Sequence, residues 1–197
     1  MMPIAPAEIV KIGHPVLRKS AWPVASGLRE SAAFAELVAI MKLTLWGRGV
    51  GLAAPQIGVG LRVFVMEDPR ERVDADRDAR EKERTAIPFE VVINPVWRPA
   101  GEEMRTFPEG CLSIPGLKAD IPRHRAIEAE WTAVDGSLRK EGLRGWPARI
   151  FQHESDHLDG KLYIDYLDDH PAVTYPETGK GVSDDLLTRL GLAADAR

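Results

Sequence analysis

An amphipathic pattern runs from Leu28 to Trp46, and Gly47 and Gly49 follow it. Its apolar residues recur at helical spacing: Phe34, Leu37, Val38, Met41 and Leu45. This period places apolar side chains along one side of an α-helix, and glycine is common just past a helix end. The pattern therefore predicts a helix that buries one face.

Shorter apolar runs later in the chain are typical of strands. The run from Leu61 to Met66 is rich in valine, and Val91-Val92-Ile93 lies just before Asn94-Pro95. From His124 to Ala133 apolar and polar residues alternate, and Asp135-Gly136 follows as a hairpin turn signal. We predict buried strands for the first two runs and a strand pair for the third.

A second helix is predicted from Trp146 to Asp159. Pro147 suits the first turn of a helix, and Gly160 suits a left-handed exit at its end. Strands lie on both sides of this helix in the sequence, without regular alternation of strand and helix. We therefore predict an α+β fold in which small β-sheets pack around this central helix.

Two polar regions interrupt or follow these elements. Fourteen of the 18 residues from Glu67 to Arg84 are charged, with both signs mixed. This composition offers little apolar surface to bury, so we expect an exposed, mobile and dispensable insertion over 67–84. The chain over 170–197 is a polar tail, apart from a cluster that predicts one or two amphipathic helical turns: Leu186, Leu187 and Leu190.

Length and composition narrow the function. The 197 residues, 44% hydrophobic and 28% charged, predict one domain over 1–197. The net charge of -4 gives no reason to expect a nucleic-acid surface, which relies on Lys and Arg. The single cysteine cannot form an intramolecular disulfide, no run approaches a membrane span, and Met1 to Val10 lack a signal-peptide pattern. We expect a cytoplasmic protein with a small or peptidic substrate.

The strongest chemical signal is His153-Glu154-Ser155-Asp156-His157. Histidines four apart on a helix point the same way, so both imidazoles can reach one metal ion with Glu154 beside it. We expect Ile150 to share this inward face. Cys111, within Glu109-Gly110-Cys111-Leu112-Ser113, supplies a third donor and leaves a fourth tetrahedral position open for water. Such an open position is typical of a catalytic site.

Each of these features also has a simpler interpretation when it is taken alone. HExxH sequences occur on solvated helix faces, and a single residue such as Cys111 is often a small buried hydrophobe. The block from Gly49 to Gln56 could be a glycine-rich turn leading into a strand. For Arg149, one turn before His153, we expect a solvated helix face. Three further histidines lack ligand spacing: His14, His124 and His170.

Taken together, the three blocks resemble the peptide deformylase family, which removes the N-terminal formyl group from newly made proteins. The family's G-x-G-x-A-A-x-Q, E-G-C-x-S and Q-H-E-x-D-H-x-x-G blocks read here, in this order, as Gly49 to Gln56, Glu109 to Ser113, and Gln152 to Gly160. A looser similarity extends from about Lys11 to Leu167. The departures are the charged insertion, the acidic tail and two residues where many members are aliphatic, Trp146 and Arg149.

The resemblance implies a role for each motif residue. Cys111, His153 and His157 would hold one divalent metal ion, for which we expect Fe²⁺, with Zn²⁺, Ni²⁺ or Co²⁺ able to occupy the same ligands. Glu154 would be the general base and would later deliver the proton to the departing amine. The two oxyanion donors would be the Gln56 side chain and the Leu112 backbone N–H.

The implied substrate is an N-formylmethionyl peptide or nascent chain, with transient ribosome contact as a further expected interaction. The peptide would lie extended along the backbone of Val50, Gly51 and Gly110 and add a strand to a sheet edge. Its methionine side chain would enter an apolar pocket beside the metal helix. Our candidates for the pocket wall are Phe107, Trp146 and Ile150.

Two other functions are open at this point. A zinc endopeptidase of the HExxH kind shares the water activation and the glutamate base, but usually takes a third ligand downstream of the helix, whereas Cys111 lies upstream. A non-catalytic metal-binding module of the same fold would need neither Glu154 nor Gln56. The presence of both residues favours the deformylase.

Overall fold

The computed structural model describes residues 4–168 and 179–192, so the predicted tail at 170–178 and 193–197 lies outside the described residues. The α-helices are α1 (Ser26–Arg29), α2 (Ala32–Leu45), α3 (Arg70–Ala75), α4 (Trp146–Leu158) and α5 (Asp184–Arg189). The strands are β1 (Gly51–Ala53), β2 (Val63–Asp68), β3 (Ile87–Pro99), β4 (Met104–Cys111), β5 (Ile114–His124), β6 (Ala126–Thr132) and β7 (Leu138–Arg144).

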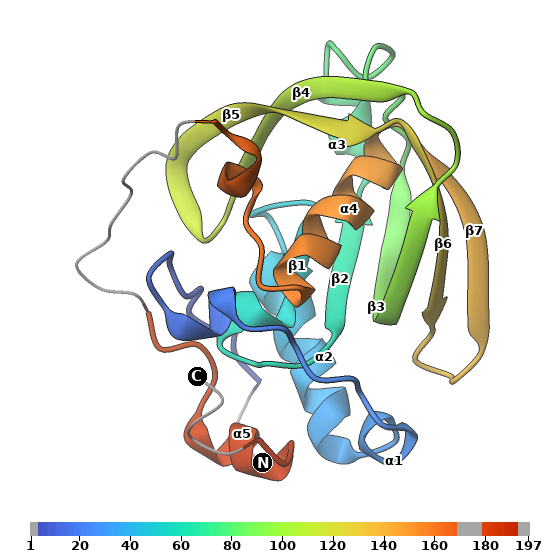
Figure 1. Cartoon of the computed structure of the whole chain (residues 1–197). Helices are drawn as coiled ribbons and strands as arrows, with labels where there is room; N and C mark the ends of the chain where they lie inside the picture. Colours follow the sequence, from blue (N-terminus) through green and yellow to red (C-terminus); the bar gives the residue numbers. More distant parts are fainter. Residues whose placement is uncertain (1–3, 169–178, 193–197) are drawn as a thin grey trace.

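The strands form two antiparallel units with α4 between them (Figure 1). One is a five-stranded sheet in the order β1-β2-β3-β6-β7, and the other is the two-stranded ribbon β4-β5, which arches over α4. The predicted α+β fold with sheets around a central helix is therefore confirmed. The predicted hairpin is β6-β7, paired from Ala126↔Arg144 to Thr132↔Leu138, and Gly136 in its turn has φ 88°.

Alternation along β2 explains why helices cover both faces of the larger sheet. Successive side chains of a strand point to opposite faces. Phe64 and Met66 belong to the core that α4 closes, in which the Phe64 and Phe151 rings meet edge to face at 5.1 Å. Val63 and Val65 belong to the core under α2 and α5. Both faces of β2 are buried, which is why its sequence reads as a continuous apolar run.

The helix predicted from Leu28 to Trp46 is divided in the structure. The side chain of Ser31 accepts a hydrogen bond from the backbone N–H of Phe34, which starts α2 after the separate short helix α1. Four of the five predicted apolar positions are buried, Phe34, Leu37, Met41 and Leu45, and Val38 is partly buried. The prediction of one continuous helix is wrong, because Ser31 is a strong N-cap inside the pattern.

A glycine with a positive φ angle borders α4 at each end. Gly145, just before the helix, has φ 63°, and Gly160, just after it, has φ 72°. A Cβ on Gly160 would lie 2.9 Å from the backbone carbon of Arg18, so no other residue fits without movement of that neighbour. The predicted helix from Trp146 to Asp159 is confirmed to within one residue.

The charged segment 67–84 is ordered, contrary to the expectation of an exposed insertion without packed structure. Strand β2 continues to Asp68, which is fully buried, and Val73 on α3 is buried as well. Arg84 bonds both oxygens of Asp68, at 2.7 and 2.8 Å, and also pairs with Asp76 at 2.7 Å. The expected exposure is wrong for Asp68 and Val73, because paired charges hold the segment against the rest of the fold. That the segment is mobile and dispensable stays a prediction.

In the described part of the tail, α5 confirms the predicted amphipathic turns, since Leu186, Leu187 and Leu190 are buried in the core with α2. Among the described residues no helix combines the length and the apolar character needed to cross a bilayer.

Candidate metal centre and cleft

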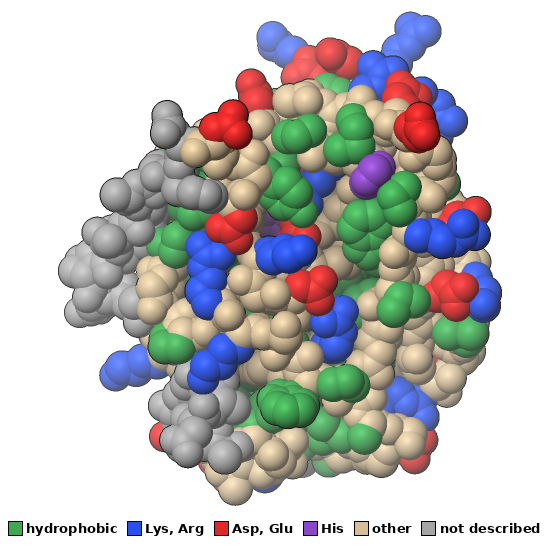
Figure 2. Space-filling view, viewed as in Figure 1, with side chains coloured by type: hydrophobic (Ala, Val, Ile, Leu, Met, Phe, Trp, Pro, Cys, Tyr) green, Lys and Arg blue, Asp and Glu red, His purple; other side chains and the backbone are tan. Residues whose placement is uncertain are grey.

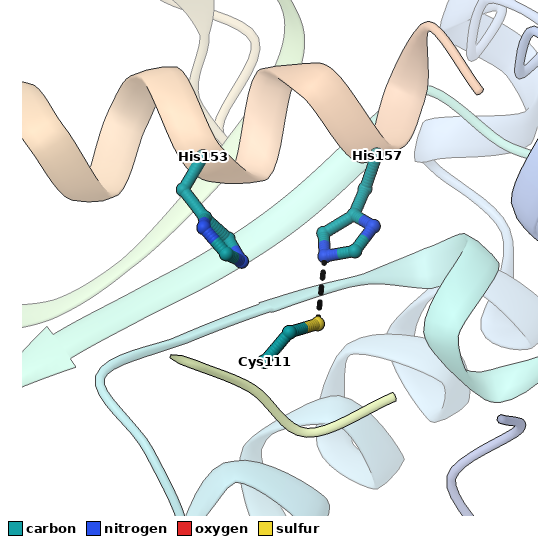
Figure 3. A group of neighbouring side chains, drawn as sticks. All are labelled: Cys111, His153 and His157. Carbon is teal, nitrogen blue, oxygen red and sulfur yellow. Dashed lines mark hydrogen bonds between the residues drawn. The ribbon is translucent and has the colours of Figure 1, made fainter. Parts of the chain in front are cut away.

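Three predicted metal ligands converge between α4 and the end of β4 (Figure 3). His153 and His157 extend from successive turns of α4 toward Cys111, and one possible ligand atom from each residue lies within 4.8 Å of those from the others. Cys111 Sγ is 3.3 Å from His157 Nε2. A thiolate and two imidazoles are donors that suit Fe²⁺ or Zn²⁺, so this set fits a divalent transition-metal ion.

Glu109 fixes the orientation of one of these imidazoles. Its Oε2 atom lies 2.9 Å from His153 Nδ1, which leaves the other ring nitrogen for the side of Cys111. Burial by itself would raise the pKa of Glu109, but hydrogen bonds from His153 and Arg123 hold it well below its ordinary value. The carboxylate is therefore ionised, and such partners behind a ligand histidine set its tautomer and ring orientation.

A buried ion network extends behind Glu109. The Arg123 guanidinium donates to both Glu109 oxygens at 3.0 Å and to Asp156 at 2.5 Å, and Tyr166 donates to Asp156 at 3.1 Å. Arg149 donates to Glu109 at 2.5 Å and to the carbonyl of Ile121 at 2.9 Å. The predicted solvated position of Arg149 is therefore wrong, because the side chain is buried and fully engaged.

Glu154, also on α4, lies against Gly51 at the start of β1. Its side chain is buried, and among the described residues nothing hydrogen-bonds its Oε2 atom. Burial raises the pKa of Glu154 to about 7, a shift that the nearby His153 opposes. A Cβ on Gly51 would lie 2.2 Å from Glu154 Oε1, so glycine at this position allows the strand to approach the carboxyl group.

The Gln56 side chain contacts Cys111, and Leu112 follows Cys111 in the chain. The Gln56 Oε1 atom accepts from the backbone N–H of Ala53 at 2.8 Å, which leaves its amide nitrogen to donate toward Cys111 Sγ at 3.3 Å and Ser113 Oγ at 3.4 Å. The Gln56 amide is buried and held in one orientation. Its donor group therefore faces the candidate metal ligands.

A cleft of about 1060 Å³ opens onto these groups. All six predicted substrate-binding residues line it: Val50, Gly51, Phe107, Gly110, Trp146 and Ile150. Glu154, Gln56 and Leu112 also reach it, as do Cys111 and His153, whereas His157 lies behind them. The structure therefore brings most of the predicted site residues to one cleft, although the sequence did not indicate that the charged segment contributes to the lining: Asp78, Glu81 and Lys82.

Charge of both signs borders this cleft. Arg48 and Lys118 line it, and so do the three residues of the charged segment. On the face drawn in Figure 2, Lys and Arg side chains are interspersed with Asp and Glu rather than gathered apart.

Two of the remaining histidines, His14 and His124, lie in the described residues, and both make contacts within the fold. The side chain of His14 accepts from the backbone N–H of Val16 at 3.3 Å and caps a short helical turn, Pro15–Arg18. His124 packs against the Trp97 ring at 6.0 Å. His170 lies outside the described residues.

Comparisons with known proteins agree with the motifs. Residues 6–172 match the model of the polypeptide deformylase family. Peptide deformylase 1 of Streptomyces coelicolor is 48% identical over 161 residues, which cover 81% of this chain and 72% of the relative. The chloroplastic peptide deformylase 1A of Solanum lycopersicum is 38% identical over 166 residues, 81% of this chain and 59% of that protein.

Solved structures give the same result. The class I type b peptide deformylase of Acinetobacter baumannii, solved with Met-Ala-Ser bound, has a TM-score of 0.73 and 30% identity, and the match covers 85% of this chain and 100% of that one. The peptide deformylase of Thermotoga maritima has a TM-score of 0.67 and 35% identity over 82% and 97% of the two chains.

Proposed function

Because this chain belongs to the peptide deformylase family, which removes the N-terminal formyl group from formyl-methionyl chains, we propose a specific role for each residue at its cleft. The observation that carries the proposal is the convergence of Cys111, His153 and His157 beside a buried glutamate and an oriented glutamine amide. Each role below follows from the position of one side chain.

We infer that Cys111, His153 and His157 hold one divalent metal ion, with Fe²⁺ as the expected ion and Zn²⁺, Ni²⁺ or Co²⁺ as possible occupants. When bound, such an ion lowers the pKa of a water molecule and polarises a carbonyl oxygen. Glu109 keeps His153 in the tautomer that this role needs. Arg123 in turn holds the Glu109 carboxylate in place through two hydrogen bonds, which stabilises the orientation of His153.

Glu154 is the proposed general base. Its pKa of about 7 suits a group that must both accept and release a proton near neutral pH. It takes a proton from the water that adds to the formyl carbon and gives it to the amine nitrogen as the carbon–nitrogen bond breaks. The products are formate and a peptide with a free N-terminal methionine.

Gln56 and Leu112 are the proposed donors to the oxyanion that develops on the formyl oxygen. The Gln56 amide is oriented by its bond from Ala53, so little reorganisation is needed when charge develops. The backbone N–H of Leu112 would supply the second donor. Donors of this kind contribute about 3 kcal/mol each to lowering the barrier.

The peptide is proposed to lie along Val50, Gly51 and Gly110, as an added strand on the edge of β1. Strand β1 is the terminal strand of its sheet and pairs with β2 on one side only. The methionine side chain would enter the part of the cleft lined by Phe107, Trp146 and Ile150. The A. baumannii relative solved with Met-Ala-Ser makes a formylated form of that tripeptide a natural test substrate.

An assay with formyl-Met-Ala-Ser and acetyl-Met-Ala-Ser tests the function. We expect formate release from the first peptide and no cleavage of the second. Cleaved internal peptide bonds would indicate the HExxH endopeptidase, and bound metal without formate release would indicate the non-catalytic module.

Three substitutions test the roles. Glu154→Gln should retain metal and lose about 10²–10⁴-fold in kcat, and Gln56→Ala should retain metal and lose about 10²–10³-fold. Cys111→Ala should lose metal and activity together. The assignment of the base fails if metal-replete Glu154→Gln turns over at the parental rate.

Some expectations stay predictions. They are the preference for iron, the cytoplasmic location, the single-domain organisation and the transient contact with the ribosome. Metal analysis of anaerobically purified protein, followed by activity after exchange with Fe²⁺ or Zn²⁺, tests the first of them.

A further inference from the structure

The charged segment 67–84 is bonded to the glycine-rich loop that leads into β1. Arg72, on α3, donates from Nη1 to the carbonyl of Gly49 at 2.5 Å and from Nη2 to the carbonyl of Gly47 at 3.4 Å. The backbone N–H of Glu67 donates to the carbonyl of Val50 at 3.0 Å. Every bond here ends on a loop carbonyl, so the segment fixes the backbone of this loop.

This loop leads directly to Gly51, where the β1 backbone and the Glu154 side chain meet. Gly51 follows it and lies against Glu154, where there is no room for even a Cβ. A small shift of the loop would therefore move β1 relative to the Glu154 carboxyl group. Arg72 reaches none of the groups proposed to react, so its effect must pass through the position of this strand.

The far end of the same segment reaches the opposite wall of the cleft. Lys82 lies over the Trp146 ring, 5.5 Å from its centroid, and Arg84 lies 5.8 Å from that centroid. Asp76 fixes Lys82 at 3.0 Å. The segment thus spans from the β1 loop to the first turn of α4, and its Asp78, Glu81 and Lys82 line the space between.

We propose that segment 67–84 is a wall of the peptide cleft, and that Arg72 is a positioning residue that holds the β1 edge in register for the incoming peptide backbone. The inference rests on the proposed function, because it takes the β1 edge as the peptide site. A preformed edge avoids the loss of entropy that ordering a glycine-rich loop would impose on each binding event.

Substrate length provides a sharp test. Formyl-methionine alone has little backbone to pair with β1, whereas formyl-Met-Ala-Ser can extend along it. We would measure kcat/KM for both substrates on the same sample and take the ratio of tripeptide to single residue. This ratio cancels the fraction of active, metal-loaded protein, so reduced folding or metal content of a variant does not affect it.

The matched variants are Arg72→Ala and Arg70→Ala, which remove the same side chain from the same helix. Within residues 4–168 and 179–192, the ion-pair partner of Arg70 is Asp74, and the two side chains are 75% and 59% exposed. We expect Arg72→Ala to lower the ratio about tenfold, as the loss of two hydrogen bonds to an ordered backbone would, mainly through the KM of the tripeptide. Arg70→Ala should leave the ratio unchanged.

The possible outcomes separate this inference from the proposed function. If the parent releases no formate from formyl-Met-Ala-Ser, the proposed function fails. If the parent is active but Arg72→Ala keeps its ratio within twofold, or Arg70→Ala lowers it equally, the positioning role is wrong. Should Arg72→Ala yield no active protein, Arg72→Lys replaces it, since lysine lacks the forked donors that reach two carbonyls, and the same criterion applies.

Discussion

Two regions of this molecule are built from arginine–carboxylate pairs, and they differ in what surrounds the pairs. Around Glu109 the network lies under the candidate metal centre, and the side chains of Arg123 and Glu109 are 3% and 4% exposed. In segment 67–84 the pairs lie nearer the surface, where the Arg84 and Lys82 side chains are 13% and 17% exposed. The carboxylate of Asp68 is fully buried, so the two regions differ mainly in the exposure of their cations.

The number of partners also differs between the two regions. Glu109 is shared by Arg123, Arg149 and His153, so its removal takes the acidic partner from Arg149 and leaves Arg123 with Asp156 alone. Arg84 in the charged segment has two acidic partners, Asp68 and Asp76, and keeps one if the other is lost. The first region is consequently intolerant of substitution, and the second can compensate.

The largest expected effect is that of Glu109→Ala. It leaves Arg123 and Arg149 buried with too few partners, and breaking a buried ion network of this kind costs about 3–5 kcal/mol of unfolding free energy. Urea denaturation with metal content matched would measure it. The control is Glu130→Ala, which removes an exposed partner of Lys140 and should cost about 1 kcal/mol or less. Equal losses in the two variants would contradict the comparison.

A smaller loss is expected for Asp68→Ala in the charged segment. The Asp68 carboxylate is fully buried, but Arg84 retains Asp76, so we expect a loss of about 2 kcal/mol. The same denaturation experiment measures it, with Asp74→Ala, which removes an exposed carboxylate from α3, as control. If Asp68→Ala lowered the unfolding free energy as much as Glu109→Ala does, the second partner of Arg84 would not compensate for the loss of the first.

A still smaller effect, on activity, is expected for Lys82→Ala. The variant removes a cation from the Trp146 ring at the cleft wall, an interaction of about 0.5–1 kcal/mol, so kcat/KM for formyl-Met-Ala-Ser should fall about threefold. Lys140→Ala, which removes a lysine from β7, is the matched control and should change nothing. If kcat/KM is unchanged in Lys82→Ala, Lys82 does not contribute to the function of the cleft.

The smallest effect concerns pH. A hydrogen bond from Arg125, with a further one from Arg144, lowers the pKa of Glu83 from 4.5 to about 2. Because the folded-state pKa is the lower one, this stabilisation is complete above about pH 4.5 and is lost as the pH falls toward 2. The pair is partly exposed, so solvent screening limits it to about 0.2–1 kcal/mol. In the Glu83→Gln variant the unfolding free energy should fall less steeply between pH 5 and about 2 than in the parent. If both proteins show the same slope, the Glu83–Arg125 pair does not contribute to stability.

The local features of the fold could be predicted from the sequence. Helix α4, its glycine exit and the two histidines depend on residues within one or two turns of each other, and so does the β6-β7 hairpin. Cys111 was recognisable because its neighbours form a motif. The break between α1 and α2 also had a local signal, the N-cap residue Ser31. The apolar repeat continues on both sides of Ser31 and therefore predicted one continuous helix.

The contacts that could not be predicted join residues far apart in the chain. Arg149 is a charged helix residue, for which a solvated position is the usual outcome, and its burial depends on Glu109, 40 positions earlier. Arg72 reaches the carbonyl of Gly49 across 23 positions. Charge counting along segment 67–84 gives the composition correctly, but it does not show which charges pair.

The shortness of β1 has a consequence for the range of chains the protein can process. The strand has three residues, Gly51–Ala53, and so offers about 10 Å of edge for pairing. A peptide that paired with this edge as proposed would be read over about three residues. On that proposal the protein would accept chains that differ beyond those residues, as a catalyst must when its substrates share little more than their first residue.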